Sequence, residues 1–196
     1  MRKSSTYLSL KRQYKSYALF FALAVACNTN KPLNAAEALP QPQVQYNLDA
    51  LPEKTRETLE RIKAAARTGD IEELRAAIEW NELPPEIEGD ETADPISKLK
   101  KSSHDGTAQD MMAVMLNIFE RGFITSGGSN KTGSTSYIWP YFAEISLTKL
   151  KPNEEVDLNR IATPGEIKAM KESGSYTGYV AIIGADGTWH SFRKKK

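Results

Sequence analysis

Few residues of this chain have the type and spacing that catalysis requires. The two histidines, His104 and His190, each lack a partner at the spacing of a metal-ligand pair or of a general base with its orienting acid. Serines are frequent in residues 126–136, but the chain has no Gly-x-Ser-x-Gly nucleophile motif. The carboxylates of Glu154 and Glu155 are neighbours at an expected helix start and do not face each other. We therefore predict no catalytic residue, which favours a protein that is not an enzyme.

Two loops resemble ion-binding sequences only in part. Residues 81–95 are acidic and interrupted by prolines, but they lack the alternating Asp/Asn positions and the terminal Glu of a calcium loop. Gly128 and Gly133 have the spacing of a phosphate-binding loop, but Ser134 stands where that loop needs its lysine, and we expect a strand to follow. We predict a hydrated acidic loop and a connector between strands, with no metal and no cofactor.

The residues that best suggest a binding surface are aromatic. The segment Tyr137–Ala143 (Tyr-Ile-Trp-Pro-Tyr-Phe-Ala) alternates as a strand, which would place Tyr137, Trp139 and Tyr141 on one side. Because Pro140 has no N–H to donate to a neighbouring strand, we expect a strand that is bulged or at the edge of its sheet. Such a row can stack on a sugar, a peptide or a partner's strand, or it can simply cover the helices as core. The candidate binding residues are Tyr137, Trp139, Tyr141, Trp189 and His190.

The first 36 residues have the composition of an export signal. Six basic residues and no acidic one precede Glu37, and they flank the apolar run Tyr17–Ala26. A run of this length is about half of the ~20 residues that span a membrane as a helix, so it favours a cleaved signal peptide over a permanent anchor. We expect cleavage between residues 26 and 38. The only cysteine, Cys27, directly follows Ala26, so a lipoprotein that carries its lipid on Cys27 is the alternative.

Removal of the leader changes the charge of the chain. The whole sequence has 26 Lys+Arg against 25 Asp+Glu, and taking away residues 1–36 removes six bases and no acid, which leaves 20 against 25. A mature chain with a net charge of −5 has no long-range attraction for nucleic acid, whose phosphates require a basic face. We interpret Arg193–Lys196 as a solvated end. We expect a periplasmic or secreted protein, or alternatively an outer-membrane lipoprotein. Its partner would be an envelope protein, a peptide or a glycan, with membrane contact only through the leader or a lipid on Cys27.

The remaining sequence predicts one α+β domain. Residues 37–50 form a Pro/Gln-rich linker, and residues 51–196 form the domain. We expect about four to six helices, including an N-terminal helix–turn–helix, packed on a small antiparallel sheet with a C-terminal hairpin. The expected helices are Pro52 to Gly69, a second from Asp70 with Glu73 as capping partner, 96–101, 107–121 and one or two within 153–173, and the hairpin joins 179–183 to 188–192 through the turn 184–187.

Four segments together resemble a known group of sequences. They are Ala66–Leu74 (Ala-Arg-Thr-Gly-Asp-Ile-Glu-Glu-Leu), Glu79–Pro84, Tyr137–Ala143 and Asp186–His190 (Asp-Gly-Thr-Trp-His). Over residues 50–192 the chain resembles a family of uncharacterised exported, periplasmic proteins of Gram-negative bacteria, a resemblance that implies export but no activity. A second resemblance, through the early helices and the Asp-Gly-Thr-Trp strand, is to the cone-shaped nuclear-transport-factor-like fold.

These observations favour a non-catalytic binding or interaction module. One alternative is a small-ligand-binding or hydrolytic pocket protein of the nuclear-transport-factor-like type, in which Trp139, Tyr141 and His190 line one cavity. Another is a lipidated envelope component.

Overall fold

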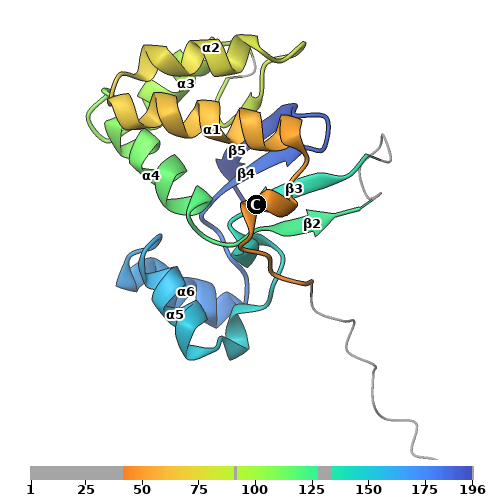
Figure 1. Ribbon diagram of the computed structural model, residues 1–196. Helices are drawn as coiled ribbons and strands as arrows, with labels where there is room; N and C mark the ends of the chain where they lie inside the picture. The colour runs from red at the N-terminus through yellow and green to blue at the C-terminus, as the bar shows by residue number, and fades with distance from the viewer. Residues whose placement is uncertain (1–41, 91, 128–133, 196) are drawn as a thin grey trace, which may run out of the picture. The chain divides into compact units, whose positions relative to one another are not determined.

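The computed structural model describes residues 42–90, 92–127 and 134–195. The leader with Cys27, the expected cleavage region, and Gly128 and Gly133 lie outside these ranges. Within the described residues six α-helices pack with a five-stranded sheet (Figure 1), which confirms the α+β class and the expected number of helices.

The N-terminal helical corner forms where the sequence predicts it. Helix α1 (Glu53–Thr68) ends at Gly69, whose φ of 75° is the left-handed conformation that glycine adopts without strain. Asp70 then caps a 3-10 turn, η2 (Ile71–Glu73), that leads into the short helix α2 (Leu74–Glu79). The Asp70 side chain accepts from the backbone N–H of Glu72, rather than forming the expected capping box with Glu73.

Two further helices complete this layer. Helix α3 (Pro95–Ser102) is capped by Asp94, and helix α4 (Gln109–Phe119) buries Met111, Met115 and Ile118. Helix α4 is shorter than the predicted 107–121 because Asp105 draws the N–H and hydroxyl of Thr107 into a turn, at 2.9 and 2.7 Å. Because the methionines of this helix are buried, they belong to the core.

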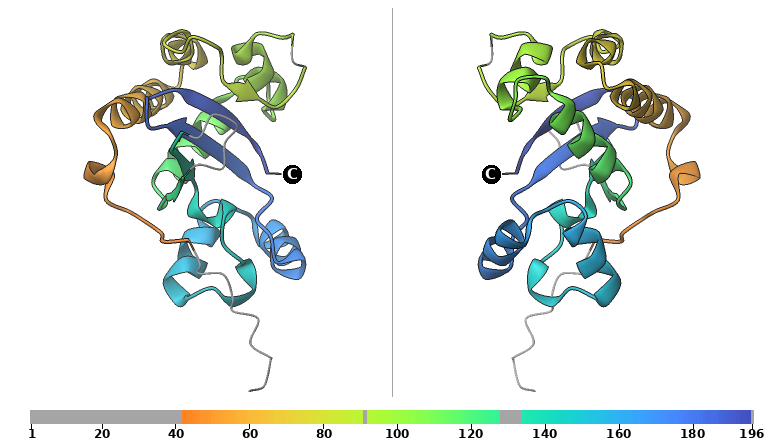
Figure 2. Two further views of the ribbon diagram at one scale, coloured as in Figure 1. Left: turned by 90° about the vertical axis from the view of Figure 1, so that its right-hand side faces the viewer. Right: turned by 90° about the vertical axis from the view of Figure 1, so that its left-hand side faces the viewer.

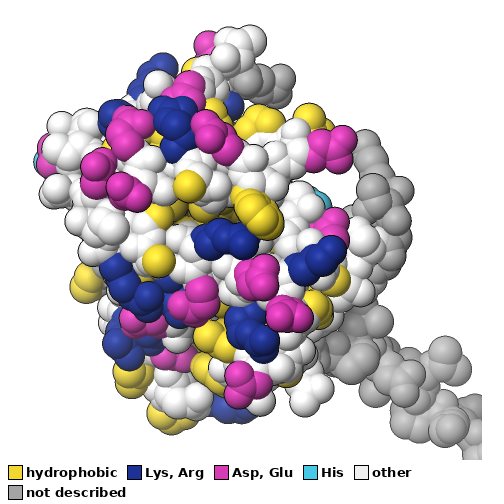
Figure 3. All heavy atoms as spheres, turned by 45° about the horizontal axis from the view of Figure 1, so that its top comes forward, with side chains coloured by type: hydrophobic (Ala, Val, Ile, Leu, Met, Phe, Trp, Pro, Cys, Tyr) yellow, Lys and Arg dark blue, Asp and Glu magenta, His cyan; other side chains and the backbone are white. Residues whose placement is uncertain are grey.

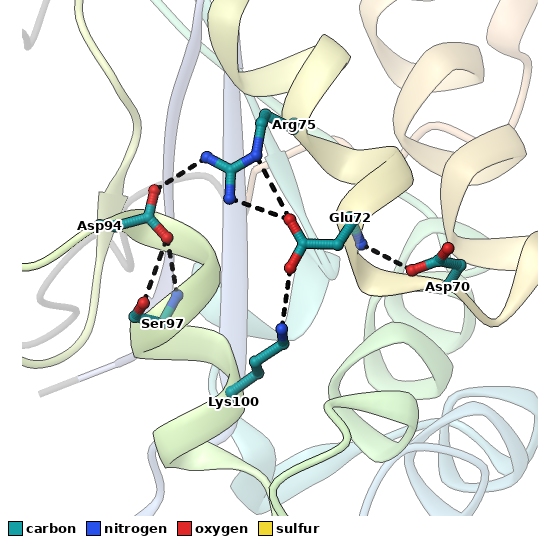
Figure 4. Close-up of polar contacts among 6 residues, drawn as sticks. All are labelled: Asp70, Glu72, Arg75, Asp94, Ser97 and Lys100. Carbon is teal, nitrogen blue, oxygen red and sulfur yellow. Dashed lines mark hydrogen bonds and ion pairs between the residues drawn. The ribbon is translucent and has the colours of Figure 1, made fainter.

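Surface ion pairs tie α2 to α3. Glu72 accepts from Arg75 at 2.9 Å and from Lys100 at 2.8 Å, and Arg75 also reaches Asp94 at 3.1 Å (Figure 4). Asp94 in turn accepts from Ser97, so the network includes the helix cap. The hydrogen bonds from Lys100 and Arg75 lower the pKa of Glu72. Because these side chains are exposed, the network aligns the two helices more than it stabilises the fold.

The sheet is mixed, with one parallel pair. Its strands are β1 (Glu86–Ile87), β2 (Ile124–Ser126), β3 (Ser136–Trp139), β4 (Tyr179–Gly184) and β5 (Trp189–Lys194), in the order β1-β5-β4-β3-β2. Among the pairs that the described strands form, only β1 and β5 are parallel. Strand β1 arises inside the acidic segment 81–95, so part of that predicted loop belongs to the sheet. Strand β5 includes Arg193 and Lys194, so these two residues pair within the sheet instead of forming a free end.

The expectation that the aromatic strand is bulged or lies at an edge was wrong, since its register with both neighbours is regular. Strand β3 is bonded on one side to β2 and on the other to β4. Its last paired residue is Trp139, so Pro140 lies just beyond the ladder and its missing N–H costs no hydrogen bond. After Pro140 the chain turns into the 3-10 helix η3 (Tyr141–Ala143).

Two groups of buried residues form the interior. Helices α1 to α4 lie together over one side of the sheet, whereas α5 (Pro152–Asn159) and α6 (Pro164–Ser173) lie below it in the view of Figure 1 and again in Figure 2. The first core joins α1–α4 to one face of the sheet, and the second joins α5 and α6 to the other face and to η3. Of the one or two helices expected within 153–173, both are present, and α6 begins after a capping box that Thr163 and Glu166 form.

The C-terminal hairpin is confirmed, and it is fastened to the first helices. Thr55 Oγ1 donates to Gly184 O at 2.8 Å, and Thr58 Oγ1 donates to Gly187 O at 2.6 Å, both in the interior. Asn81 exchanges two hydrogen bonds with the backbone of Trp189, at 3.0 and 3.1 Å. Segments more than a hundred residues apart are therefore joined through backbone groups of the turn and of β5.

The described part of the linker packs against the domain. Gln45 exchanges backbone hydrogen bonds with Phe123, at 2.9 and 2.8 Å, and Leu48–Ala50 form a 3-10 turn, η1. A Cβ on Gly122 would lie 2.8 Å from Val44 Cγ1 and 2.9 Å from Gln45 O. The glycine therefore permits the close approach of this arm to the end of α4.

Candidate functional site

Most of the aromatic side chains singled out in the sequence lie in the interior. Trp139 and Trp189 are completely buried in the first core, where Tyr137 is also buried. Phe123 lies beside Trp139, with ring centroids 5.1 Å apart. The indole N–H of Trp139 has no hydrogen-bond partner in the described part of the chain. In this conformation the side chains of Tyr137, Trp139 and Trp189 contribute to core packing and offer almost no surface to a ligand. Ligand binding by these three residues therefore stays a prediction.

Tyr141 lies in a different core from Tyr137 and Trp139. Since the chain leaves the sheet after Pro140, Tyr141 is buried in the second core and not on the face of Trp139. Its hydroxyl lies 3.3 Å from Asp157 Oδ2, and Tyr46 reaches the same oxygen at 3.5 Å. Burial, reinforced by the hydroxyl of Tyr46, raises the pKa of Tyr141, which keeps its hydroxyl protonated as a donor.

Asp157 is also the counter-charge of a buried cation. Arg121 Nη1 lies 2.9 Å from Asp157 Oδ1, and only 4% of the Arg121 side chain is exposed. Arg121 further donates to Asn117 O at 3.2 Å and pairs with Glu120 at 3.2 Å. This arrangement joins the end of α4 to α5 and satisfies the buried guanidinium, which is a structural role.

His190 lies at the surface of the hairpin. It is exposed and occupies the β-bulge between β4 and β5, where Ile182 pairs with Ser191 and Ile183 pairs with Trp189. A Cβ on Gly184 would lie 2.7 Å from His190 Nε2 and 2.4 Å from Asp186 Oδ1, so the imidazole and the carboxylate approach each other over this glycine. The N–H of Thr188, with a smaller contribution from His190, lowers the pKa of Asp186.

The structure does not bring Trp139, Tyr141 and His190 together. Trp139 is in the first core, Tyr141 is in the second, and His190 is on the hairpin surface. His104 lies in the exposed turn before α4, where its backbone N–H donates to Asp110.

A cleft of about 520 Å³ lies between α4, the turn from α5 to α6, and the segment that enters β4. Its floor is mainly apolar and uses side chains of both cores. The floor residues are Val114, Ile118, Ile161, Met170, Tyr176 and Tyr179. Burial raises the pKa of Tyr176, so its hydroxyl stays protonated and donates to Tyr179 O at 3.1 Å. That bond fixes the loop beside the cleft.

The rim of the cleft is polar and contains charges of both signs. Arg160 lies 3.9 Å from Glu120, and Lys194 Nζ lies 5.6 Å from the ring centroid of Tyr179. Glu166 is held by the capping box, in which the N–H and hydroxyl of Thr163 donate to it at 2.8 and 2.7 Å. These bonds lower the pKa of Glu166 and keep its carboxylate charged. The site therefore combines an apolar interior with fixed polar groups at its mouth.

Sequence reasoning missed this cleft. Its walls come from three separate segments of the chain. In each segment the sequence pattern predicts that the apolar residues belong to the core. The sequence feature that comes closest to indicating the cleft is the pair of apolar residues Ile161 and Ala162, which lie between the polar end of α5 and the polar start of α6.

Within the described ranges no three His, Cys, Asp or Glu residues gather in a way that could hold a metal ion. No helix of those ranges has the length and apolar character needed to cross a bilayer. In comparisons by sequence and by structure, no protein-family model, curated protein or solved structure matches this chain. The resemblance drawn from its motifs therefore stays a prediction.

Proposed function

We propose that this chain is a non-catalytic binding module that takes a small, largely apolar ligand into the cleft between α4, α6 and β4. The observation that carries the proposal is the cleft itself. Its volume of about 520 Å³ lies within the ~300–1,000 Å³ typical of small-molecule sites. Its apolar floor would supply affinity, and the polar groups of its rim would orient the ligand.

The floor is supported in a way that suits a preformed site. Val114, Ile161 and Tyr179 are partly exposed and would contact the ligand, whereas Ile118, Met170 and Tyr176 are almost fully buried and offer little surface of their own. Tyr176 is anchored by its hydrogen bond to the backbone of Tyr179. Because these side chains are already ordered, a ligand would lose little free energy in arranging them.

Filling the cleft tests the proposal. Thr177 is an exposed residue that lines it, so Thr177→Trp should place an indole where the ligand lies without disturbing the core. With the neutral fluorescent probe N-phenyl-1-naphthylamine, we expect saturable binding to the domain and an affinity at least about tenfold lower in the variant, a loss of about 1.4 kcal/mol.

The matched control is Ser175→Trp, which adds the same indole two residues earlier, at an exposed position that does not line the cleft. Its affinity for the probe should equal that of the parent protein. Equal binding by Thr177→Trp, or no saturable binding by the parent, would refute the cleft as a ligand site.

We further propose that the module is exported and acts in the periplasm or outside the cell, because of the basic, apolar leader in residues 1–36. Expression of the full chain in a Gram-negative host should yield a processed product, lacking at least residues 1–26, in the osmotic-shock fraction. A membrane-bound product that is released by Cys27→Ser would identify the lipoprotein form instead. Intact polypeptide in the cytosol would contradict export.

A further inference from the structure

The loop that follows α2 exposes two large apolar side chains. Trp80 is 64% exposed and Leu83 is 74% exposed, the highest values among the large hydrophobic residues that the structure describes. We refer to residues Glu79–Leu83 as the Trp80 loop. Neither apolar side chain lines the ligand cleft. Tryptophan at such a position is the residue type that most often dominates the free energy of a protein–protein contact.

The Trp80 loop is held in place rather than left free. Asn81 exchanges two hydrogen bonds with the backbone of Trp189, which fixes the loop to strand β5. The guanidinium carbon of Arg61 lies 3.8 Å from the centroid of the Trp80 ring, and Arg61 itself pairs with Glu57 at 3.6 Å. One side of the indole is therefore occupied by a cation of the same chain, and its orientation is set before any partner arrives.

Along the sequence, the charged residues around this loop are all acidic, although the cation of Arg61 lies over the Trp80 ring. Between Arg75 and Lys98 the sequence has seven Asp or Glu residues and no Lys or Arg. Some of these carboxylates are paired within the fold, as Glu86 is with Arg193 at 3.3 Å. Glu79 and Glu82, which flank Trp80, are exposed and form no ion pair with any residue that the structure describes. Figure 3 shows that acidic, basic and hydrophobic side chains lie next to one another on the face that includes α1 and α2, so the acidic character of the loop comes from Glu79 and Glu82, unpaired among the described residues, and not from a uniformly acidic face.

We propose that the Trp80 loop is a docking surface for a basic segment of a partner protein, one that presents Lys or Arg beside an apolar side chain. Trp80 and Leu83 would contact the apolar group, and the carboxylates of Glu79 and Glu82 would bind the cations. Charge complementarity selects this partner, because an acidic segment would be repelled by the same carboxylates. The surface is separate from the ligand cleft, so it does not depend on the function proposed for the cleft.

A synthetic peptide tests the proposal. The probe is an acetylated, amidated hexapeptide of alternating Lys and Leu, with an alternating Glu and Leu hexapeptide as its opposite. The basic peptide should shift the indole N–H resonance of Trp80 saturably, and the acidic peptide should not. Trp80→Ala should weaken binding of the labelled basic peptide at least tenfold. The double substitution Glu79→Gln, Glu82→Gln should weaken it about fivefold and reduce its dependence on salt.

Val156→Ala is the matched control, because Val156 is 61% exposed on α5 and far along the chain from the loop; it should leave affinity unchanged. The proposal is overturned if the basic peptide causes no shift, if both peptides bind equally, or if Trp80→Ala binds as the parent does. A dimer that dissociates on Trp80→Ala would make a second copy of the chain the occupant. A shift caused by chito-oligosaccharides but not by the basic peptide would make it a glycan. Both results also overturn the proposal.

Discussion

Replacing Asp157 by alanine is expected to lower the free energy of unfolding by about 3 kcal/mol, because it leaves the buried guanidinium of Arg121 without its closest carboxylate. The side chain of Arg121 is 4% exposed, so water cannot replace the lost partner. The hydroxyl of Tyr141, also buried, loses its acceptor at the same time. Urea denaturation followed by circular dichroism measures the effect.

Glu120→Ala provides the matched comparison. Glu120 also pairs with Arg121, at 3.2 Å, but its side chain is 52% exposed. Its removal should therefore cost no more than about 1 kcal/mol. The double substitution Arg121→Met, Asp157→Leu removes both charges and should recover part of the loss. Equal losses for Asp157→Ala and Glu120→Ala would show that burial of the pair does not determine its contribution.

Trp189→Ala is expected to lower the free energy of unfolding by about 4 kcal/mol, the size typical of an aromatic ring removed from a packed interior. Trp189 is completely buried in the first core, and its indole N–H donates to Ser191 O at 3.1 Å. The substitution creates a cavity between the helices and the sheet and leaves that carbonyl without its donor. The unfolding midpoint should fall while the dependence on denaturant stays the same.

Trp80→Ala removes the same side chain from the surface. Because Trp80 is 64% exposed and its ring contact is with Arg61, the loss should be about 1 kcal/mol or less. Trp80→Ala and Trp189→Ala remove the same side chain and differ only in how deeply that side chain is buried. A loss for Trp80→Ala as large as that for Trp189→Ala would contradict the assignment of the Trp80 loop to the surface. In that case a weaker affinity of the Trp80→Ala variant for the basic peptide could no longer be attributed to the loss of a direct contact.

The parts of the fold that were predictable from sequence are those that local chemistry determines. Gly69 ends α1, Thr163 and Glu166 start α6, and Asp186 and Gly187 form the turn of the hairpin. In each case a few neighbouring residues decide the backbone conformation, so no knowledge of the rest of the chain is needed.

The position of the aromatic strand was not predictable in the same way. Whether β3 lies at an edge depends on β2 and β4, which pair with it from both sides. Pro140 indicates a bulge or an edge only if the strand continues through it. The chain instead leaves the sheet after Trp139, which sends Tyr141 into the other core.

The candidate cleft was beyond sequence reasoning for a related reason. Its floor needs Ile118, Met170 and Tyr179 to meet, and nothing in any one segment indicates the others. The Trp80 loop lies between these extremes. Its acidic character was evident in the sequence, but the exposure of Trp80 depends on how Asn81 fastens the loop to β5.

Strand β5 follows every other described helix and strand in the sequence, yet in the sheet it lies between β1 and β4. Until residues 189–194 emerge from the ribosome, β1 lacks β5, its one partner among the described strands, and the first core lacks Trp189 and Phe192. Pairing across such a separation is slow. If the chain is exported as proposed, this late closure would keep the nascent polypeptide unfolded and able to pass through a narrow secretion channel.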